Sequence, residues 1–324
     1  TNLNLTAMAL VLGMGLAMTT ANAALTDIAN SPLANGSSIV KPNVMFVLDD
    51  SGSMNWDHMP DSVDDDPACK DADSSLRDCN FADPAYNSAQ FNGIYYNPAI
   101  TYTPAVNYDG TSRSSYTTWT AVPNDAYGIQ FTGTIDLTTS YPDTVWCNTS
   151  SPTTADRTAP FASGNCRRPI QAGVWTYPDA TFRRLYAEVG TRNPYFYTIS
   201  SLTWCGTANA AGFGTGTCQA KKTTTYQYAK YGTGSNGFTR VDIVPATANY
   251  PRASTRTDCS GAVGSTGCTY AEEMTNFANW YAYYRTRMQM MKTGSGLAFK
   301  QVTDSFRVGF ITINPGSPVA ASKY

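Results

Sequence analysis

Eight cysteines constrain the fold of this 324-residue chain more than any other feature, because all of them lie between Cys69 and Cys268. They form four successive couples, with a short separation inside each couple and a long one before the next. An even number of thiols can pair completely outside the reducing cytosol. Zinc binding by four thiolates is the alternative, but the sequence has no C-x-x-C pair to support it. We therefore predict four disulfides, although spacing alone leaves their connectivity open: Cys69–Cys79, Cys147–Cys166, Cys205–Cys218 and Cys259–Cys268.

The start of the chain indicates export. An apolar run from Leu3 to Met18 is followed by Ala21-Asn22-Ala23, a pattern of small residues that signal peptidases cleave. A run this short is typical of a secretory signal peptide rather than a membrane span, and a buried hydrophobic helix is the alternative. The chain lacks an initiating Met and a charged first segment, so we expect it to start slightly inside the full sequence. No second span follows, and we expect no transmembrane segment in the mature chain.

The charged residues exclude several classes of function. The chain has 22 basic and 24 acidic residues, and this near-neutral balance argues against a nucleic-acid binder. A single histidine, His58, removes most multi-His zinc sites and nearly all nucleophilic triads that use a His base. We expect His58 to be an ordinary surface or capping residue. Any metal site in this chain should therefore use oxygen ligands.

Two apolar runs enclose the cysteine-bearing segment. Residues 43–48 (NVMFVL) predict a central strand covered on both faces, and residues 306–314 (FRVGFITIN) predict a second strand. Thr269 and Glu272 fit a capping box before a helix, and Gly294 is expected to end that helix. An apolar stripe at spacings of three and four predicts about twenty helical residues: Met274, Phe277, Tyr281, Tyr284, Met288 and Met291.

The order of strand, long excursion, helix and strand predicts an α/β unit, in which ligands bind beyond the carboxyl ends of the strands. Asp49, Ser51 and Ser53 directly follow the first predicted strand. They place one carboxylate and two hydroxyls on a tight turn, and such hard oxygen ligands suit Mg²⁺, Ca²⁺ or Mn²⁺. The sequence therefore predicts a divalent-cation site here. An ordinary turn of Asp and Ser residues is the alternative.

The D-x-S-x-S pattern at Asp49, Ser51 and Ser53 resembles the metal-ion-dependent adhesion site of von Willebrand factor A domains. This resemblance implies a von Willebrand factor A-like (Rossmann-like) α/β fold and an open coordination position for an incoming oxygen ligand. In that family a Thr and an Asp from later loops complete the site. Because the chain stops soon after its second predicted strand, we expect the domain to be truncated at its C-terminus and the remaining ligands to lie beyond residue 324.

These patterns divide the chain into five expected segments. The first strand and the metal turn are separated from the helix by a large disulfide-rich insertion of short strands and loops. In order, we expect a signal peptide at 1–23, a linker at 24–42, the first strand and metal turn at 43–59, the insertion at 60–268, and the first helix and second strand at 269–324.

A second resemblance comes from residues 91–98 (FNGIYYNP), 256–259 (RTDC) and 276–292 (NFANWYAYYRTRMQMMK). They look like the N-terminal region of type IV pilus tip adhesins of the PilC/PilY type. The resemblance implies a bacterial protein exported through the inner membrane to the pilus tip, the outer-membrane surface or the extracellular space. The implied partners are minor pilins at the tip and a host or abiotic surface. The implied roles are pilus assembly, attachment and twitching motility, with a propeller further along the full chain.

Two other functions stay open. An extracellular hydrolase would use a pair of carboxylates from the Asp-rich stretch 57–83, but the chain has only three Glu residues and two of them are explained by the helix start. A solvated acidic loop is the simpler interpretation of that stretch. A pilus-biogenesis or force-sensing module without its own receptor is the other alternative. We predict a binding module rather than an enzyme, with no catalytic residues.

Overall fold

A computed structural model describes residues 41–63, 69–70, 76–77, 79, 81–171, 173–209, 213–232, 237–302 and 305–313. The expected signal peptide and most of the expected linker therefore lie outside the described residues. The chain divides into two compact units, Thr1–Asn43 and Val44–Tyr324, and the description below concerns the second. No helix in the described ranges combines the length and the apolar character that crossing a membrane requires.

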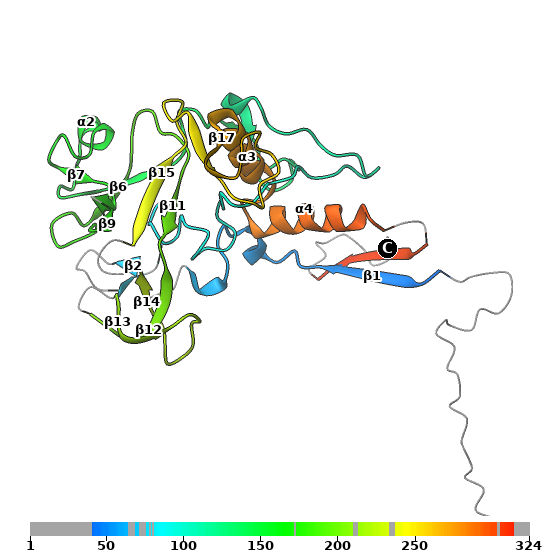
Figure 1. The fold of residues 1–324 in the computed structure, drawn as a ribbon, viewed down its shortest axis with the longest axis horizontal. Helices are drawn as coiled ribbons and strands as arrows, with labels where there is room; N and C mark the ends of the chain where they lie inside the picture. The colour runs from blue at the N-terminus through cyan, green and yellow to red at the C-terminus, as the bar shows by residue number, and fades with distance from the viewer. Residues whose placement is uncertain are drawn as a thin grey trace, which may run out of the picture. The chain divides into compact units, whose positions relative to one another are not determined.

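Short strands dominate the described part of the chain (Figure 1). The α-helices described are α2 (Thr154–Thr158), α3 (Tyr270–Tyr283) and α4 (Arg287–Phe299), and the short 3-10 helices are η1 (Gly52–Asn55), η2 (Asp61–Val63) and η3 (Trp119–Ala121). The strands are β1 (Asn43–Leu48), β2 (Cys69–Lys70), β3 (Leu76–Arg77), β4 (Val122–Pro123), β5 (Thr134–Ile135), β6 (Thr144–Cys147), β7 (Cys166–Arg167), β8 (Ile170–Gln171), β9 (Val174–Trp175), β10 (Arg184–Ala187), β11 (Tyr195–Ile199), β12 (Leu202–Ala208), β13 (Gly214–Gln219), β14 (Tyr228–Tyr231), β15 (Phe238–Asp242), β16 (Asn249–Arg252), β17 (Gly264–Thr269) and β18 (Arg307–Thr312).

The sheets within the described residues have two or three strands each. The three-stranded sheets have the orders β10-β6-β7 and β13-β12-β14, and the longest two-stranded ladders are β11-β15 and β16-β17. All of these ladders are antiparallel. The expected von Willebrand factor A-like, Rossmann-like α/β fold is therefore wrong, because the described chain consists mostly of small antiparallel sheets with few helices.

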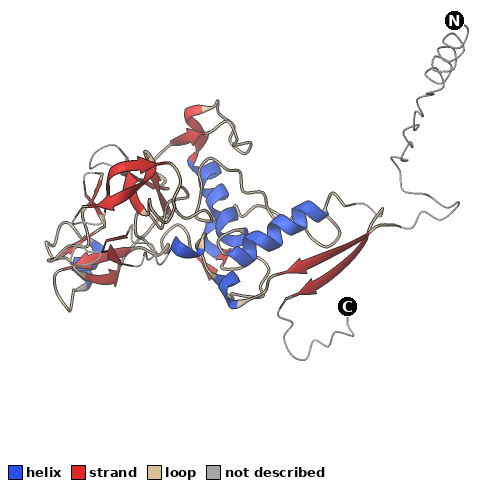
Figure 2. Cartoon of the chain, turned by 90° about the horizontal axis from the view of Figure 1, so that it is seen from below, coloured by secondary structure: helices blue, strands red, loops and turns tan. Residues whose placement is uncertain are grey.

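The wrong prediction of the fold originates in the first apolar run, residues 43–48. It forms β1 as expected, but β1 pairs with β18 alone in a two-stranded sheet of the described residues. Met45 is 66% exposed and Val47 is 56% exposed, whereas only Leu48 at the end of the strand is buried. The N–H of Ile313 donates to the carbonyl of Leu48 at 2.9 Å, so the carboxyl ends of the two strands meet and the strands run parallel (Figure 2). An apolar run predicts a strand, but the burial of that strand depends on neighbours that the run does not specify.

The helix after the last cysteine forms in two pieces. α3 ends at Tyr283, and Thr286 caps the start of α4 by accepting from the N–H of Gln289, whose side chain accepts from the N–H of Thr286. The apolar stripe therefore spans two helices, and the expected stop at Gly294 is wrong, because α4 continues to Phe299. α4 lies along the β1–β18 pair in both views (Figures 1 and 2). Phe46 of β1 contacts Phe299 at the end of α4, with 5.1 Å between ring centroids.

The capping box predicted at the start of α3 is confirmed. The Thr269 hydroxyl accepts from the Glu272 N–H at 3.3 Å, and the Glu272 carboxylate accepts from the Thr269 N–H at 2.8 Å. We expect Thr269→Ala to lower the free energy of unfolding by about 1 kcal/mol, because one N–H at the helix start loses its acceptor. Denaturant unfolding measures the change. Thr269→Ser keeps the acceptor and should unfold like the parent chain, and an Ala variant of unchanged stability would contradict the assignment.

The core of the described chain is unusually rich in aromatic side chains. α3 contributes Phe277 and Trp280, which contact Tyr96 at centroid distances of 4.9 Å and 5.9 Å. Tyr195 and Tyr197 of β11 are fully enclosed in the same cluster. The core is thus built from α3 and from strands and loops of the cysteine-bearing segment, rather than between a central sheet and covering helices.

Three of the predicted disulfides are confirmed, namely Cys147–Cys166, Cys205–Cys218 and Cys259–Cys268. Cys79 is buried and disulfide-bonded, while the side chain of Cys69, its expected partner, lies outside the described residues. The Cys147–Cys166 disulfide joins the neighbouring strands β6 and β7, and Cys205–Cys218 joins β12 and β13. Each disulfide contributes about 2–4 kcal/mol, mainly by restricting the unfolded chain.

Candidate metal-binding turn

The three predicted metal ligands gather on the turn between β1 and η1. The N–H of Ser51 donates to Oδ1 of Asp49 at 2.9 Å, which folds the Asp49 carboxylate back over the turn. The hydroxyls of Ser51 and Ser53 lie 3.0 Å apart and share a hydrogen bond. Ser51 has extended backbone angles and precedes the 3-10 helix that carries Ser53. Spacing by two residues is therefore enough to bring these side chains together.

The Asp49 carboxylate is held in its charged form. The hydrogen bond from the Ser51 backbone, followed by one from the Ser51 side chain, lowers the pKa of Asp49 below its ordinary value. All three side chains are partly exposed to solvent. A negative carboxylate with two neighbouring hydroxyls is a donor set that hard divalent cations accept. Its exposure leaves room for water or for an oxygen of a binding partner.

Side chains alone do not complete a metal site at this turn. Within the described ranges, no group of three or more His, Cys, Asp or Glu side chains is placed to hold a metal ion. The turn supplies one carboxylate and two hydroxyls, whereas Mg²⁺ takes six oxygen ligands and Ca²⁺ six to eight. A cation held here would therefore need water or further protein oxygens. The residues fit an open, hydrated cation site rather than a closed structural one.

The chain leaving the turn is fixed to α4. The N–H of Arg287 donates to the Trp56 carbonyl at 3.1 Å, and the Arg287 guanidinium lies over the Trp56 ring at 4.9 Å. The Trp56 ring in turn stacks on the His58 ring, with 5.1 Å between centroids. The first turn of α4 thus positions the segment that follows Ser53.

His58 is not the surface residue expected from sequence. It is 5% exposed, and its Nδ1 lies 3.2 Å from the Tyr86 hydroxyl, which donates to the Asp57 carboxylate at 2.6 Å. The interpretation failed because a single polar residue carries no periodicity that would reveal burial. Its neighbour Trp56 is two residues away, but Tyr86 comes from another part of the chain, and only the tertiary structure places it beside His58.

A methionine-lined hollow beside the turn was also missed by sequence reasoning. It measures about 700 Å³, opens widely to solvent, and is lined by Met54, Met59, Pro60, Asp61, Arg287, Met290 and Met291. Met54 belongs to η1 and Met290 and Met291 belong to α4, so the hollow lies where the turn meets that helix. The predicted apolar stripe included Met291. The spacing of the stripe along the helix did not indicate that this face would lie against the turn that carries Asp49.

Comparisons with known proteins give one relative of this chain. It is 31% identical over 102 residues to the type IV pilus biogenesis factor PilY1 of Pseudomonas aeruginosa strain PAK. The match covers 30% of this chain and 9% of that relative. No family model matches, and no solved structure matches. The similarity indicates a relation to a type IV pilus protein, and together with the disulfides it fits an exported protein.

Proposed function

We propose that this chain is an exported, type IV pilus-associated module that attaches to a surface through a divalent cation at Asp49, Ser51 and Ser53. The observation that carries the proposal is the convergence of one carboxylate and two hydroxyls on a partly exposed turn. The similarity to a type IV pilus biogenesis factor supports the association with pili. The proposed role is binding rather than catalysis, and the proposed partners are minor pilins and a host or abiotic surface.

Each residue of the turn has a distinct part in this proposal. Asp49 supplies the negative charge, and the Ser51 N–H orients that carboxylate. Ser51 and Ser53 supply neutral oxygens, which leave the cation with residual positive charge to attract a carboxylate or another oxygen of the surface. Mg²⁺, Ca²⁺ and Mn²⁺ all accept such ligands.

Asp49→Ala tests the cation site directly. We expect cation affinity to fall at least about tenfold, since even residues that only support a metal ligand change affinity by about 10–100-fold. Titration calorimetry of the purified chain with Mg²⁺, Mn²⁺ and Ca²⁺ measures the change. In cells carrying the full protein, attachment should fall with the same substitution and with a chelator, while secretion stays normal.

Asp109→Ala is a matched control. The Asp109 carboxylate accepts from the N–H of Thr111 at 3.0 Å and from its hydroxyl at 2.6 Å, and the same kind of hydrogen bonding lowers the pKa of Asp109. Asp109 thus forms the same kind of turn, but Arg113 stands at the position that corresponds to Ser53. Its variant should bind cations like the parent chain. Unchanged cation binding in Asp49→Ala would refute the proposal.

A role in pilus biogenesis without a receptor is the second candidate. It is favoured by the description of the relative as a biogenesis factor. The two functions separate in the Asp49→Ala strain, because loss of biogenesis reduces the number of surface pili, whereas loss of attachment leaves pili in normal number that no longer bind. Counting pili by electron microscopy beside an attachment assay distinguishes them.

A further inference from the structure

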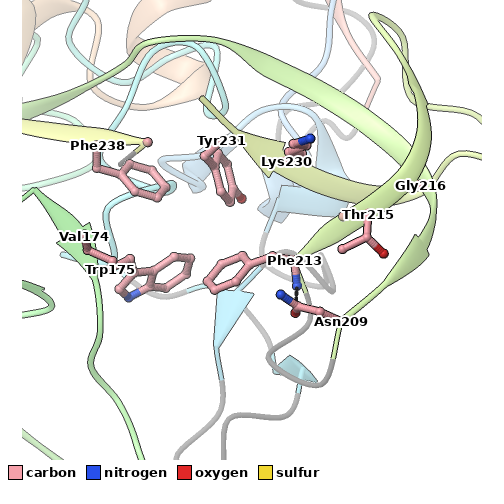
Figure 3. Close-up of a pocket in the computed structure, with 11 residues that line it drawn as sticks. Val174, Trp175, Asn209, Phe213, Thr215, Gly216, Lys230, Tyr231 and Phe238 are labelled. Atoms are coloured by element: carbon pink, nitrogen blue, oxygen red, sulfur yellow. Dashed lines mark hydrogen bonds between the residues drawn. The ribbon is translucent and has the colours of Figure 1, made fainter. Parts of the chain in front are cut away.

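A second hollow lies in the cysteine-bearing segment, between β9, β13, β14 and β15 (Figure 3). It measures about 440 Å³, which is within the range of small-molecule sites in proteins. Aromatic rings form one side of it, and Lys230 and Thr215 lie on the other side. Its lining residues are Val174, Trp175, Asn209, Phe213, Gly214, Thr215, Gly216, Lys230, Tyr231, Gly237 and Phe238.

The aromatic side is a set of rings held at steep mutual angles. Trp175, Phe213 and Tyr231 have centroids 5.9 to 6.3 Å apart, and their planes are inclined by 56° to 80°. Phe238 packs on Tyr231 with 4.6 Å between centroids. Trp175, Tyr231 and Phe238 are almost fully buried, so their contact with the hollow is limited to parts of each ring. The rings form fixed apolar walls rather than a mobile surface patch.

Parts of the described backbone at the hollow are held in place as well. The Cys205–Cys218 disulfide joins β12 to β13, the strand that carries Thr215. The N–H of Asn209 donates to the Phe213 carbonyl at 2.9 Å, and the Phe213 N–H donates to the Asn209 side chain at 3.0 Å. These bonds set the position of the Phe213 ring. A ligand would therefore enter a largely preformed site, which lowers the entropic cost of binding.

The charge of the hollow narrows the class of ligand. Among the described residues that line it, Lys230 is the single charged one and none is Asp or Glu, and the ion pairs of the described residues do not include Lys230. The positive charge of Lys230 disfavours cationic ligands, including the quaternary ammonium groups that aromatic cages hold. It attracts an anion, and a carboxylate is the anion that pairs with Lys through charge-assisted hydrogen bonds.

We propose that this hollow binds a carboxylated sugar residue of an acidic glycan. The apolar C–H face of such a ring matches the partly exposed Phe213 ring, and its hydroxyls match the Thr215 hydroxyl, which also lies 3.2 Å from the Thr207 hydroxyl. Its carboxylate matches Lys230. A surface-attachment module that binds such glycans would have a recognition site separate from the cation turn, so this inference does not depend on metal binding at Asp49.

The test is calorimetric binding of a hyaluronan tetrasaccharide, which carries uronate groups, beside chitotetraose, which carries none. The parent chain should bind the acidic probe at least about tenfold more tightly, the effect of one hydrogen bond to a charged group. Lys230→Met should remove that preference and leave the affinity for chitotetraose unchanged. Phe213→Ala should weaken binding of both probes, because it removes part of the apolar wall.

Lys221→Met is the matched control, because Lys221 is an exposed lysine outside the hollow, and it should bind both probes like the parent. Binding should also persist with a chelator and in Asp49→Ala, which separates this site from the proposed cation site. Equal affinity for the two probes, loss of binding with the chelator, or no binding of either probe would overturn the proposal. Binding of N-acetylphenylalaninamide in place of the sugars would overturn it in favour of an aromatic side chain from a protein partner.

Discussion

Arg256→Met is expected to lower the free energy of unfolding by about 3–5 kcal/mol, the cost of leaving a buried charge without its partner. Arg256 is fully buried, and its guanidinium donates to Glu273 at 2.8 Å and to both carboxylate oxygens of Asp258 at 2.7 and 2.8 Å. Glu273 is also fully buried, and it accepts from the Tyr96 hydroxyl at 2.7 Å. Without Arg256, the Glu273 carboxylate keeps its charge in the core with one hydroxyl donor. Denaturant unfolding at pH 7 measures the loss.

The pH dependence of the stability loss in Arg256→Met identifies the cause of that loss. Burial raises the pKa of Glu273 above its ordinary value, and the neighbouring Arg256 opposes that rise. In Arg256→Met the pKa of Glu273 rises further, so the native state takes up a proton at a pH where the unfolded chain is ionised. The variant's deficit should therefore be largest near neutral pH and shrink as the pH falls toward about 4.3, the ordinary pKa of Glu.

Arg256→Met combined with Glu273→Gln is the control for this prediction. The double variant no longer buries an unpaired charge, so it should recover much of the stability that the single variant loses. A single variant that loses less than about 1 kcal/mol, or a deficit that does not change with pH, would show that the ion pair does not govern the stability of this region.

Trp280→Ala should cost about 3–5 kcal/mol of unfolding free energy, because it removes the largest buried ring of α3 and leaves a cavity. Trp280 is 1% exposed and contacts Phe277 and Tyr95 at centroid distances of 5.0 Å and 5.1 Å. Its indole N–H donates to the Ile94 carbonyl at 2.9 Å. Trp280 therefore joins α3 to the loop around Tyr95, and thermal or denaturant unfolding should show the loss in a single transition.

Two variants define the range of this effect. Trp280→Phe keeps a ring but leaves the Ile94 carbonyl without its donor, so its loss should be intermediate. Tyr108 is fully exposed, and Tyr108→Ala should change the stability by less than about 0.5 kcal/mol. If Trp280→Ala unfolds like Tyr108→Ala, the described core is not the one that stabilises the chain.

Local features of the fold were predictable from sequence. The capping box at Thr269 and Glu272 depends on atoms three residues apart, and the backbone of a helix start brings them together in any fold. The confirmed disulfides likewise join cysteines separated by 9 to 19 residues, where a short strand-to-strand connection suffices. The turn of Asp49, Ser51 and Ser53 belongs to the same class, because its hydrogen bonds span two residues. Whether that turn binds a cation remains a prediction.

Features that depend on distant segments were predicted wrongly or missed. The α/β fold was expected because the apolar run in β1 is of the kind that fills a central strand, yet most of its side chains are exposed. The break between α3 and α4 was missed because the apolar stripe continues through the residues that cap the second helix. The aromatic hollow combines residues from Val174 to Phe238, and no sequence period connects them.

The sequence by itself determined the short-range structure of this protein: the sites of its disulfides, the start of α3, the positions of β1 and β18, and the oxygen-bearing turn at Asp49. Each follows from interactions between residues close along the chain, or from a periodicity that covers one element. Only the tertiary structure decided which faces are buried, that His58 lies inside, and that Lys230 lines the same hollow as four aromatic residues. Burial and charge environment depend on which distant segments pack together, and neither composition nor spacing encodes that packing in a form that one sequence reveals.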